Sequence, residues 1–120
     1  MTNRPRSAPA RQSTKVELAA RAKNYIGEHY TEKFSLDALA SALFVNKIYL
    51  AKTFKEVTGS TLLRFFNETR CREACRLLAE TDLNIEIIGN QVGYSTASHF
   101  AKQFRSSCGC TPSEYRKRNR

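Results

Sequence analysis

The chain has 120 residues, 41% of them hydrophobic and 26% charged, a composition that supports one small globular core and argues against disorder of the whole chain. No apolar run approaches the roughly 18 residues of a membrane-spanning helix, and the first eleven residues lack the apolar core of a signal peptide, which argues against a membrane protein and a secreted precursor. The 20 Lys and Arg residues outnumber the 11 Asp and Glu residues, and the resulting formal charge of +9 suits a polyanionic partner such as nucleic acid.

The positive charge lies at the two ends of the chain. Residues 1–15 carry four basic residues and no acid, whereas residues 101–120 carry six basic residues and one acid, Glu114. The two ends therefore account for the whole net charge. Residues 1–15 also contain Pro5 and Pro9 and show no apolar periodicity. We expect a flexible basic tail or an interdomain linker there.

From residue 16 onward, apolar residues recur at helical spacing, and we expect an all-α fold of about seven helices with no strand. The first helix is expected to begin at Val16. A short helix follows the N-cap candidate Ser35, and another lies between the N-cap candidate Asn46 and the terminating glycine Gly59.

The second half of the chain is expected to begin with a long helix over Thr61–Glu80, a stretch that holds neither Gly nor Pro. A helix around Ile85–Ile88 follows, and then a helix that contains Phe100 and ends at Gly109. The segment Thr111-Pro112-Ser113-Glu114 opens a last short helix, with Pro at its first position.

A repeat relates the two halves of the chain. At an offset of 49 residues, Leu36, Leu39, Ala40, Leu43, Phe44, Val45 and Asn46 match Ile85, Ile88, Gly89, Val92, Gly93, Tyr94 and Ser95. One residue inserted in the second turn raises the offset to 50, so that Leu50, Phe54, Lys55 and Gly59 match Phe100, Phe104, Arg105 and Gly109. Each copy is a helix, a tight turn and a second helix, the plan of a helix-turn-helix motif. We expect two such subdomains, residues 16–59 and 81–118, joined by a linking helix over residues 60–80.

The second helix of each copy has an outward face that suits DNA. Leu50, Phe54 and Val57 are expected to face the core in the first copy, and Phe100 and Phe104 in the second. The outward positions are then Lys47, Ile48, Ala51, Lys52 and Lys55 in the first helix, and Ala97, Ser98, Ala101, Lys102 and Arg105 in the second. Both sets lack acids and are short or basic, so they avoid repulsion from phosphates and fit close to base edges. A linking helix over residues 61–80 is about 30 Å long, close to the roughly 34 Å between major-groove segments on one face of B-DNA.

The four cysteines do not have the spacing of a usual zinc site. They form a C-x3-C pair, Cys71 and Cys75, and a C-x-C pair, Cys108 and Cys110. We expect reduced structural thiols, with Cys75 exposed, and neither a metal nor a cofactor. The chain also lacks a Ser/His/acid set, a glycine-rich phosphate loop and a carboxylate pair in an apolar setting, so no enzyme activity is expected.

The second copy carries the long motif Ile85-x2-Ile88-Gly89-x2-Val92-Gly93-Tyr94-Ser95-x3-His99-Phe100-x3-Phe104-Arg105-x3-Gly109-x-Thr111-Pro112-Ser113-Glu114-Tyr115-Arg116. This motif resembles the signature of the AraC/XylS family of bacterial transcription regulators, and the first copy fits it through Leu36, Leu39-Ala40, Tyr49-Leu50, Phe54-Lys55 and Thr58-Gly59. The resemblance covers residues 16–118. It implies a homeodomain-like, seven-helix DNA-binding domain whose third and sixth helices enter adjacent major grooves near a promoter.

The resemblance also implies roles for single residues. Base-reading positions fall on Ile48, Ala51, Lys52, Ser98, Ala101 and Lys102, with Lys47 on the same outward face. Phosphate-contacting positions match or neighbour Asn46, Lys55, Thr96, His99 and Arg105. Lys52 and Lys102 are equivalent in the repeat, and either a guanine edge or phosphate alone fits them. Phe44 stands where this family often has Gly, and a left-handed turn at Phe44 costs about 1–2 kcal/mol.

The sequence therefore predicts a sequence-specific DNA-binding regulator in the bacterial cytoplasm, associated with the nucleoid. Activation through RNA polymerase is implied by the resemblance. Many family members carry a separate ligand-sensing and dimerising domain, so the chain is either a stand-alone regulator or a fragment with a basic linker. Two alternatives stay open: a nonspecific nucleic-acid binder, and a thiol-based redox or metal-responsive regulator that uses its cysteines.

Overall fold

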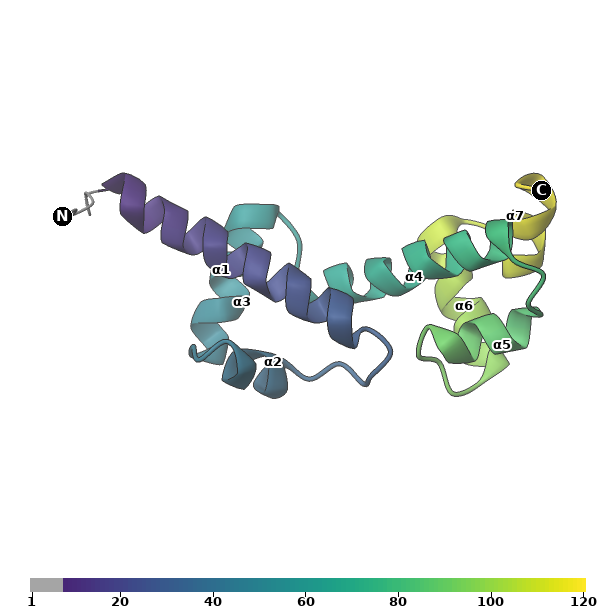
Figure 1. Ribbon diagram of the computed structural model, residues 1–120, viewed down its shortest axis with the longest axis horizontal. Coiled ribbons are helices and arrows are strands. Elements are labelled where there is room, and N and C mark those ends of the chain that lie inside the picture. Colours follow the sequence, from purple (N-terminus) through teal and green to yellow (C-terminus); the bar gives the residue numbers. More distant parts are fainter. Residues whose placement is uncertain (1–7) are drawn as a thin grey trace. The chain divides into compact units, whose positions relative to one another are not determined.

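The computed structural model describes residues 8–120, with side chains from residue 14 onward, and these residues form seven helices and no strand. The helices are α1 (Ala8–His29), α2 (Leu36–Ala42), α3 (Lys47–Thr58), α4 (Leu62–Glu80), α5 (Ile85–Gln91), α6 (Ala97–Cys108) and α7 (Pro112–Arg118) (Figure 1). The predicted all-α fold is confirmed. None of the described helices combines the length and the apolarity that a membrane span requires.

The described residues divide into two compact units. The first contains residues 8–28 and 35–65, and with them α1, α2, α3 and the first turn of α4. The second contains residues 29–34 and 66–120, and with them the rest of α4 and α5, α6 and α7. The predicted linking helix is thus divided between the two units at residue 65, and the predicted subdomain boundaries stay a prediction.

Helix α1 begins at Ala8, eight residues before the expected start at Val16. The segment from Ala8 to Lys15 therefore differs from the flexible tail predicted over residues 1–15. Its Ala, Arg, Gln and Lys residues favour helix, and Pro9 lies in the first turn, where a missing N–H group is tolerated. The rest of the predicted tail, residues 1–7, lies outside the described residues.

The core of the first unit is assembled from one face of each of its helices. Its buried hydrophobic residues are Leu18, Ala19, Ala22 and Ile26 of α1, Leu39 and Ala40 of α2 with the following Leu43, Leu50 and Phe54 of α3, and Leu62 of α4. Val57 was also expected in this core, but it is 38% exposed. Thr53 is buried, at i+3 from Leu50 on the inward stripe of α3, whereas Val57 lies on the same stripe but next to the end of the helix.

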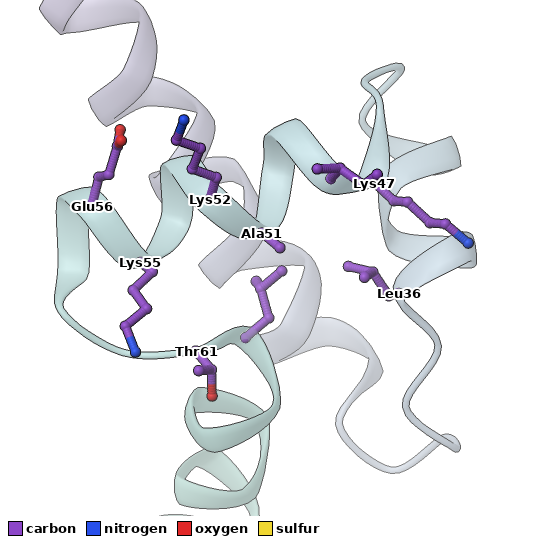
Figure 2. Close-up of a pocket in the computed structure, with 9 residues that line it drawn as sticks. Leu36, Lys47, Ala51, Lys52, Lys55, Glu56 and Thr61 are labelled. Carbon is purple, nitrogen blue, oxygen red and sulfur yellow. The ribbon is translucent and has the colours of Figure 1, made fainter.

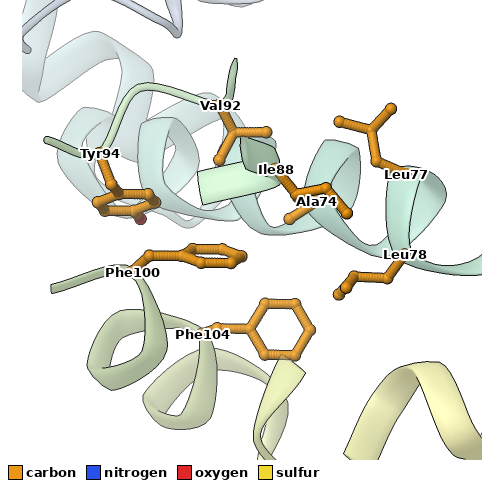
Figure 3. Packing of buried hydrophobic residues seen from close by; sticks show 8 residues of the cluster. All are labelled: Ala74, Leu77, Leu78, Ile88, Val92, Tyr94, Phe100 and Phe104. Carbon is orange, nitrogen blue, oxygen red and sulfur yellow. The ribbon is translucent and has the colours of Figure 1, made fainter. Parts of the chain in front are cut away.

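The core of the second unit is dominated by aromatic rings. It consists of Ala74, Leu77, Leu78, Ile88, Val92, Tyr94, Phe100 and Phe104 (Figure 3). The Phe100 and Phe104 rings meet edge to face with centroids 5.8 Å apart, a favourable aromatic geometry. A side chain on Gly89 would place its Cβ 2.8 Å from the Phe100 ring, so α5 and α6 approach closely because this position is glycine.

The turns of the two copies have equivalent backbone hydrogen bonds. The Val45 N–H donates to the Ala40 carbonyl at 3.1 Å, and the equivalent Tyr94 N–H donates to the Gly89 carbonyl at 2.9 Å. The repeat predicted from the sequence is therefore present in the backbone. The inserted residue is Ser95, because α3 is capped by Asn46 and α6 by Thr96. Matching Asn46 to Ser95, as the sequence suggests, is wrong by one position.

The predicted capping residues and terminating glycines are confirmed. The Ser35 Oγ accepts a hydrogen bond from the Ala38 N–H at 3.0 Å, and Gly59 and Gly109 end α3 and α6 with φ angles of 79°. Helix α7 opens with a capping box: the Thr111 Oγ1 accepts from the Glu114 N–H, and the Glu114 carboxylate accepts from the Thr111 N–H.

A single arginine holds several segments of the second unit together. Arg70 is 7% exposed, and its guanidinium donates to the Tyr30 carbonyl at 2.6 Å and to the Glu32 carbonyl at 2.8 Å. The same group stacks on Phe66 and Tyr94, at 4.5 and 4.9 Å from the ring centroids. Burial lowers the pKa of Arg70, and Tyr94 acts in the opposite direction. Arg70 thus joins the segment after α1 to α4 and to the turn before α6.

Replacing Phe44 by glycine is expected to stabilise the protein. Phe44 has φ 59° and is 90% exposed, so glycine removes backbone strain without loss of packing. The relief of about 1–2 kcal/mol exceeds the roughly 0.5–1 kcal/mol of chain entropy that glycine costs. Urea unfolding of Phe44→Gly should show a higher midpoint with an unchanged m-value. Phe44→Ala, which keeps the Cβ, is the control, and an equal gain in both variants would contradict the strain argument.

Arg70→Met is expected to lower the free energy of unfolding by about 3 kcal/mol, because the carbonyls of Tyr30 and Glu32 lose a charged donor and the buried guanidinium loses its stacking on Phe66 and Tyr94. Arg72→Met is the matched control, since Arg72 is exposed on the same helix, and a change within about 0.5 kcal/mol is expected there. Urea unfolding followed by circular dichroism measures both. Equal losses in the two variants would show that Arg70 does not hold these segments together.

Candidate nucleic-acid interface

Helix α3 turns one side to solvent because Leu50, Thr53 and Phe54 occupy the other. The helix begins at Asn46, whose Oδ1 accepts hydrogen bonds from the N–H groups of Ile48 at 2.8 Å and Tyr49 at 3.0 Å. The side-chain oxygen of Asn46 is therefore engaged in capping, while its predicted phosphate contact stays a prediction.

The predicted base-reading residues of the first copy lie together on this exposed side. Ile48 is 72% exposed, Lys47 and Lys52 are exposed, and Ala51 is half-buried. Ile48 therefore lies outside the buried core of the first unit. Lys47 donates to the Asp37 carboxylate at 2.9 Å, so this lysine already has an acidic partner on α2.

A hollow of about 710 Å³ lies along the exposed side of α3. It is lined by Leu36 of α2, by Lys47, Ile48, Ala51, Lys52, Lys55 and Glu56 of α3, and by Thr61 and Leu62 at the start of α4. Figure 2 shows Ala51 and Leu36 directed into the hollow, while the lysines extend outward in different directions. The floor is apolar and the rim is mainly basic.

The exposed side of α3 was predicted to lack acidic residues, but Glu56 lies beside it. It borders the hollow, and its carboxylate lies 3.4 Å from the Lys15 Nζ. Glu56 is not among the outward positions predicted from the sequence, which are Lys47, Ile48, Ala51, Lys52 and Lys55. Lys15 offsets this one acid, and the remaining charged residues that line the hollow are basic.

Helix α6 repeats the arrangement in the second unit. Phe100 and Phe104 are buried, whereas Ser98 and Lys102 are exposed and Ala101 is half-buried. The Thr96 Oγ1 accepts from the His99 N–H at 3.1 Å, so Thr96 is a cap, as Asn46 is in the first copy.

Two predicted phosphate-contacting residues of the second copy also have partners within the chain. The exposed His99 ring meets the Tyr94 ring edge to face at 5.2 Å, so it has a packing contact besides any contact with DNA. Arg105 is exposed, and its charge helps to lower the pKa of Glu114, although the Thr111 N–H is the larger cause.

Three lysines of the two surfaces have no acidic partner. Neither Lys52 nor Lys55 nor Lys102 forms an ion pair or a side-chain hydrogen bond with any residue that the structure describes. An unpaired exposed lysine loses no internal bond when it binds an anion. The predicted site residues thus form one set on α3 and an equivalent set on α6, each within its own unit.

The structure also brings together three residues that sequence reasoning treated as separate. The Sγ atoms of Cys71, Cys75 and Cys108 all lie within 4.8 Å of one another, and those of Cys75 and Cys108 are 4.0 Å apart. All three residues are half-buried, so the expectation that Cys75 is the exposed thiol is wrong. Burial is the main cause that raises the pKa of Cys71 and of Cys75. The i, i+4 spacing of Cys71 and Cys75 was the available signal, but it does not reveal Cys108.

Comparison with known protein families places the two surfaces in context. A family model described as a helix-turn-helix domain matches residues 39–118. The chain is 35% identical over 105 residues to the uncharacterised HTH-type transcriptional regulator YisR of Bacillus subtilis. The matched stretch covers 88% of this chain and 37% of YisR. The chain spans about a third of the length of the curated relatives it matches.

Solved structures share the fold. A transcriptional regulator of Chromobacterium violaceum, described as having an AraC-type DNA-binding domain, matches with a TM-score of 0.82 and 26% identity over 89% of this chain and 96% of that chain. The DNA-binding domain of AdpA, a transcriptional factor solved in complex with a target DNA, matches with a TM-score of 0.76 and 25% identity over 83% of this chain and 90% of that chain.

Proposed function

Because this chain belongs to the AraC/XylS family of DNA-binding transcription regulators, we propose that it recognises a specific promoter sequence by placing α3 and α6 in adjacent major grooves. The observation that carries the proposal is the equivalence of two exposed surfaces. Lys52 on α3 and Lys102 on α6 occupy the same place in the repeat, each beside a half-buried alanine and each without an acidic partner among the described residues.

Base reading on α3 rests on Lys52 and on the apolar residues beside it. A lysine in the major groove donates to the O6 and N7 acceptors of guanine, and small or apolar side chains contact the thymine methyl group. Ile48 and Ala51 offer such apolar contacts, and the exposure of Ile48 gives it surface to bury against DNA. On α6, Ser98 replaces the isoleucine, so the two helices are expected to prefer different bases.

Phosphate contacts are assigned to the flanks of both helices. Lys55 and Arg105 hold equivalent places one turn after the reading lysines, and His99 is exposed near the start of α6. Asn46 and Thr96 act through capping, because their side-chain oxygens accept from N–H groups of the first turns and so fix where α3 and α6 begin. Binding carried by such contacts weakens steeply as salt concentration rises.

The regulatory part of the proposal follows the family resemblance. We assign the chain to an activator that acts through RNA polymerase, with control exercised by a separate sensor and dimerisation domain. The length of the curated relatives, about three times that of the matched segment, supports the existence of further domains in proteins of this kind.

Selection from a randomised duplex library tests whether the chain reads sequence. Two short preferred blocks about one helical turn apart are expected, because recognition units on one face of B-DNA are separated by about 10 base pairs. The bound pool is sequenced at near-physiological salt. A single block would overturn the role of one helix, and salt-sensitive binding without enrichment would establish the nonspecific binder instead.

Lys52→Ala and Lys102→Ala are each expected to cost about 1–3 kcal/mol of binding free energy at the selected site and to relax base preference in one block only. Lys55→Ala is the matched control, because loss of a phosphate contact weakens all sequences alike and lowers the salt slope by about one. Fluorescence anisotropy against the selected duplex and single-base variants measures both effects. Uniform weakening by all three variants would contradict base reading.

A further inference from the structure

We propose that Cys71, Cys75 and Cys108 form a binding site for a soft, thiophilic metal ion held by three thiolates. The three Sγ atoms lie within 4.8 Å of one another, although Cys108 is 33 residues away from Cys75 along the chain. The site lies in the second unit, it includes none of the predicted DNA-contacting residues, and it does not depend on the proposed DNA recognition.

The spacing of the sulfurs suits an ion at their centre. An ion equidistant from three sulfurs that are about 4 Å apart lies about 2.3 Å from each, which is the length of a metal–thiolate bond. The Cys75 and Cys108 sulfurs are already 4.0 Å apart. The other pairs, which extend to at most 4.8 Å, need only a small inward movement of the Cys71 side chain or its neighbours.

Two helices hold the ligands in place. Cys71 and Cys75 are four residues apart on α4, so their side chains lie one turn apart on the same face. Cys108 is the last residue of α6, immediately before the left-handed Gly109. All three pack against the aromatic core of the second unit, which limits their motion before an ion binds. A bound ion would tie the end of α6 to the middle of α4.

The donor set selects the class of ion. The cluster contains thiols alone, with no imidazole or carboxylate atom from the described residues inside it. Thiolates alone favour soft ions such as copper(I), whereas a structural zinc site is completed by four protein ligands. Each thiol that binds releases its proton to solvent, so three protons leave for one ion bound.

Disulfide formation explains the cluster less well. A disulfide would join two of the sulfurs and leave the third unused, whereas all three Sγ atoms lie within 4.8 Å of one another. The Cys75 and Cys108 sulfurs are 4.0 Å apart and both thiols are free, while a disulfide bond is about 2.05 Å long. One metal ion at the centre of the cluster binds all three sulfurs.

Copper(I) titration of the reduced chain under anaerobic conditions tests the site, with a chromophoric copper(I) chelator as competitor. One copper(I) per chain is expected for the wild type. Cys71→Ala, Cys75→Ala and Cys108→Ala should each weaken binding by more than about 100-fold, since losing even a hydrogen-bond partner of a ligand costs roughly 10–100-fold. Cys110→Ala is the matched control, because Cys110 is buried in the same unit but lies outside the cluster, and its affinity should equal that of the wild type.

Thermal unfolding gives a second measurement, which separates loss of copper(I) binding from loss of the fold in a variant. Copper(I) should raise the melting temperature of the wild type and of Cys110→Ala but not of Cys75→Ala. Circular dichroism is recorded first, and Cys75→Ser replaces the alanine variant if helicity is lost. Absence of bound copper(I), or equal binding by the cluster variants and the control, would overturn the proposal. Because no DNA is present, neither result bears on DNA recognition.

Discussion

The orientation of α3 and α6 about their own axes is set by two buried stripes, and every property of the exposed surfaces depends on it. Leu50 and Phe54 on α3, and Phe100 and Phe104 on α6, are at most 2% exposed. Since a helix has one residue every 100°, burying these positions determines which side chains face solvent. A shift of one residue in either stripe would turn the helix by 100°, so that Phe54, Phe100 and Phe104 would leave the core and a different set of side chains would face solvent.

Two C-terminal arginines are engaged within the chain, so the net charge overstates the positive charge that is free to bind a polyanion. Arg116 donates to the carbonyls of Leu78 and Thr81 at 3.0 Å each, and Arg120 donates to the Thr81 carbonyl at 2.9 Å and pairs with Asp82. These contacts satisfy carbonyls at the end of α4, which have no partner within the helix. Part of the basic C-terminal segment therefore stabilises the fold, so the exposed lysines of α3 and α6 are better indicators of DNA binding than the total of +9.

The features that the sequence predicts correctly are those fixed by local chemistry. Ser35, Asn46 and Gly59 mark helix ends because capping depends on residues a few positions apart. The repeat is visible because both copies bury the same pattern. The start of α1 was missed because Pro9 reads as a helix breaker, although the first turn accepts it.

The thiol cluster was missed for a different reason. It requires the end of α6 to meet the middle of α4, and this proximity follows from packing rather than from spacing along the chain. The burial of Thr53 in place of Val57 likewise depends on which side of α3 its neighbours cover. Contacts between segments that are distant along the chain cannot be predicted from the spacing of residues in the sequence.

The extra residue Ser95 makes the two copies unequal. Helix α6 begins one residue later relative to its turn than α3 does, and the two helices present Ser98 and Ile48 at equivalent places. A symmetric dimer reads a palindrome and binds it equally well in both directions. The two helices proposed to read DNA have no such symmetry, so a DNA site contacted by both would have a polarity, and the protein bound there would point one way along the chromosome.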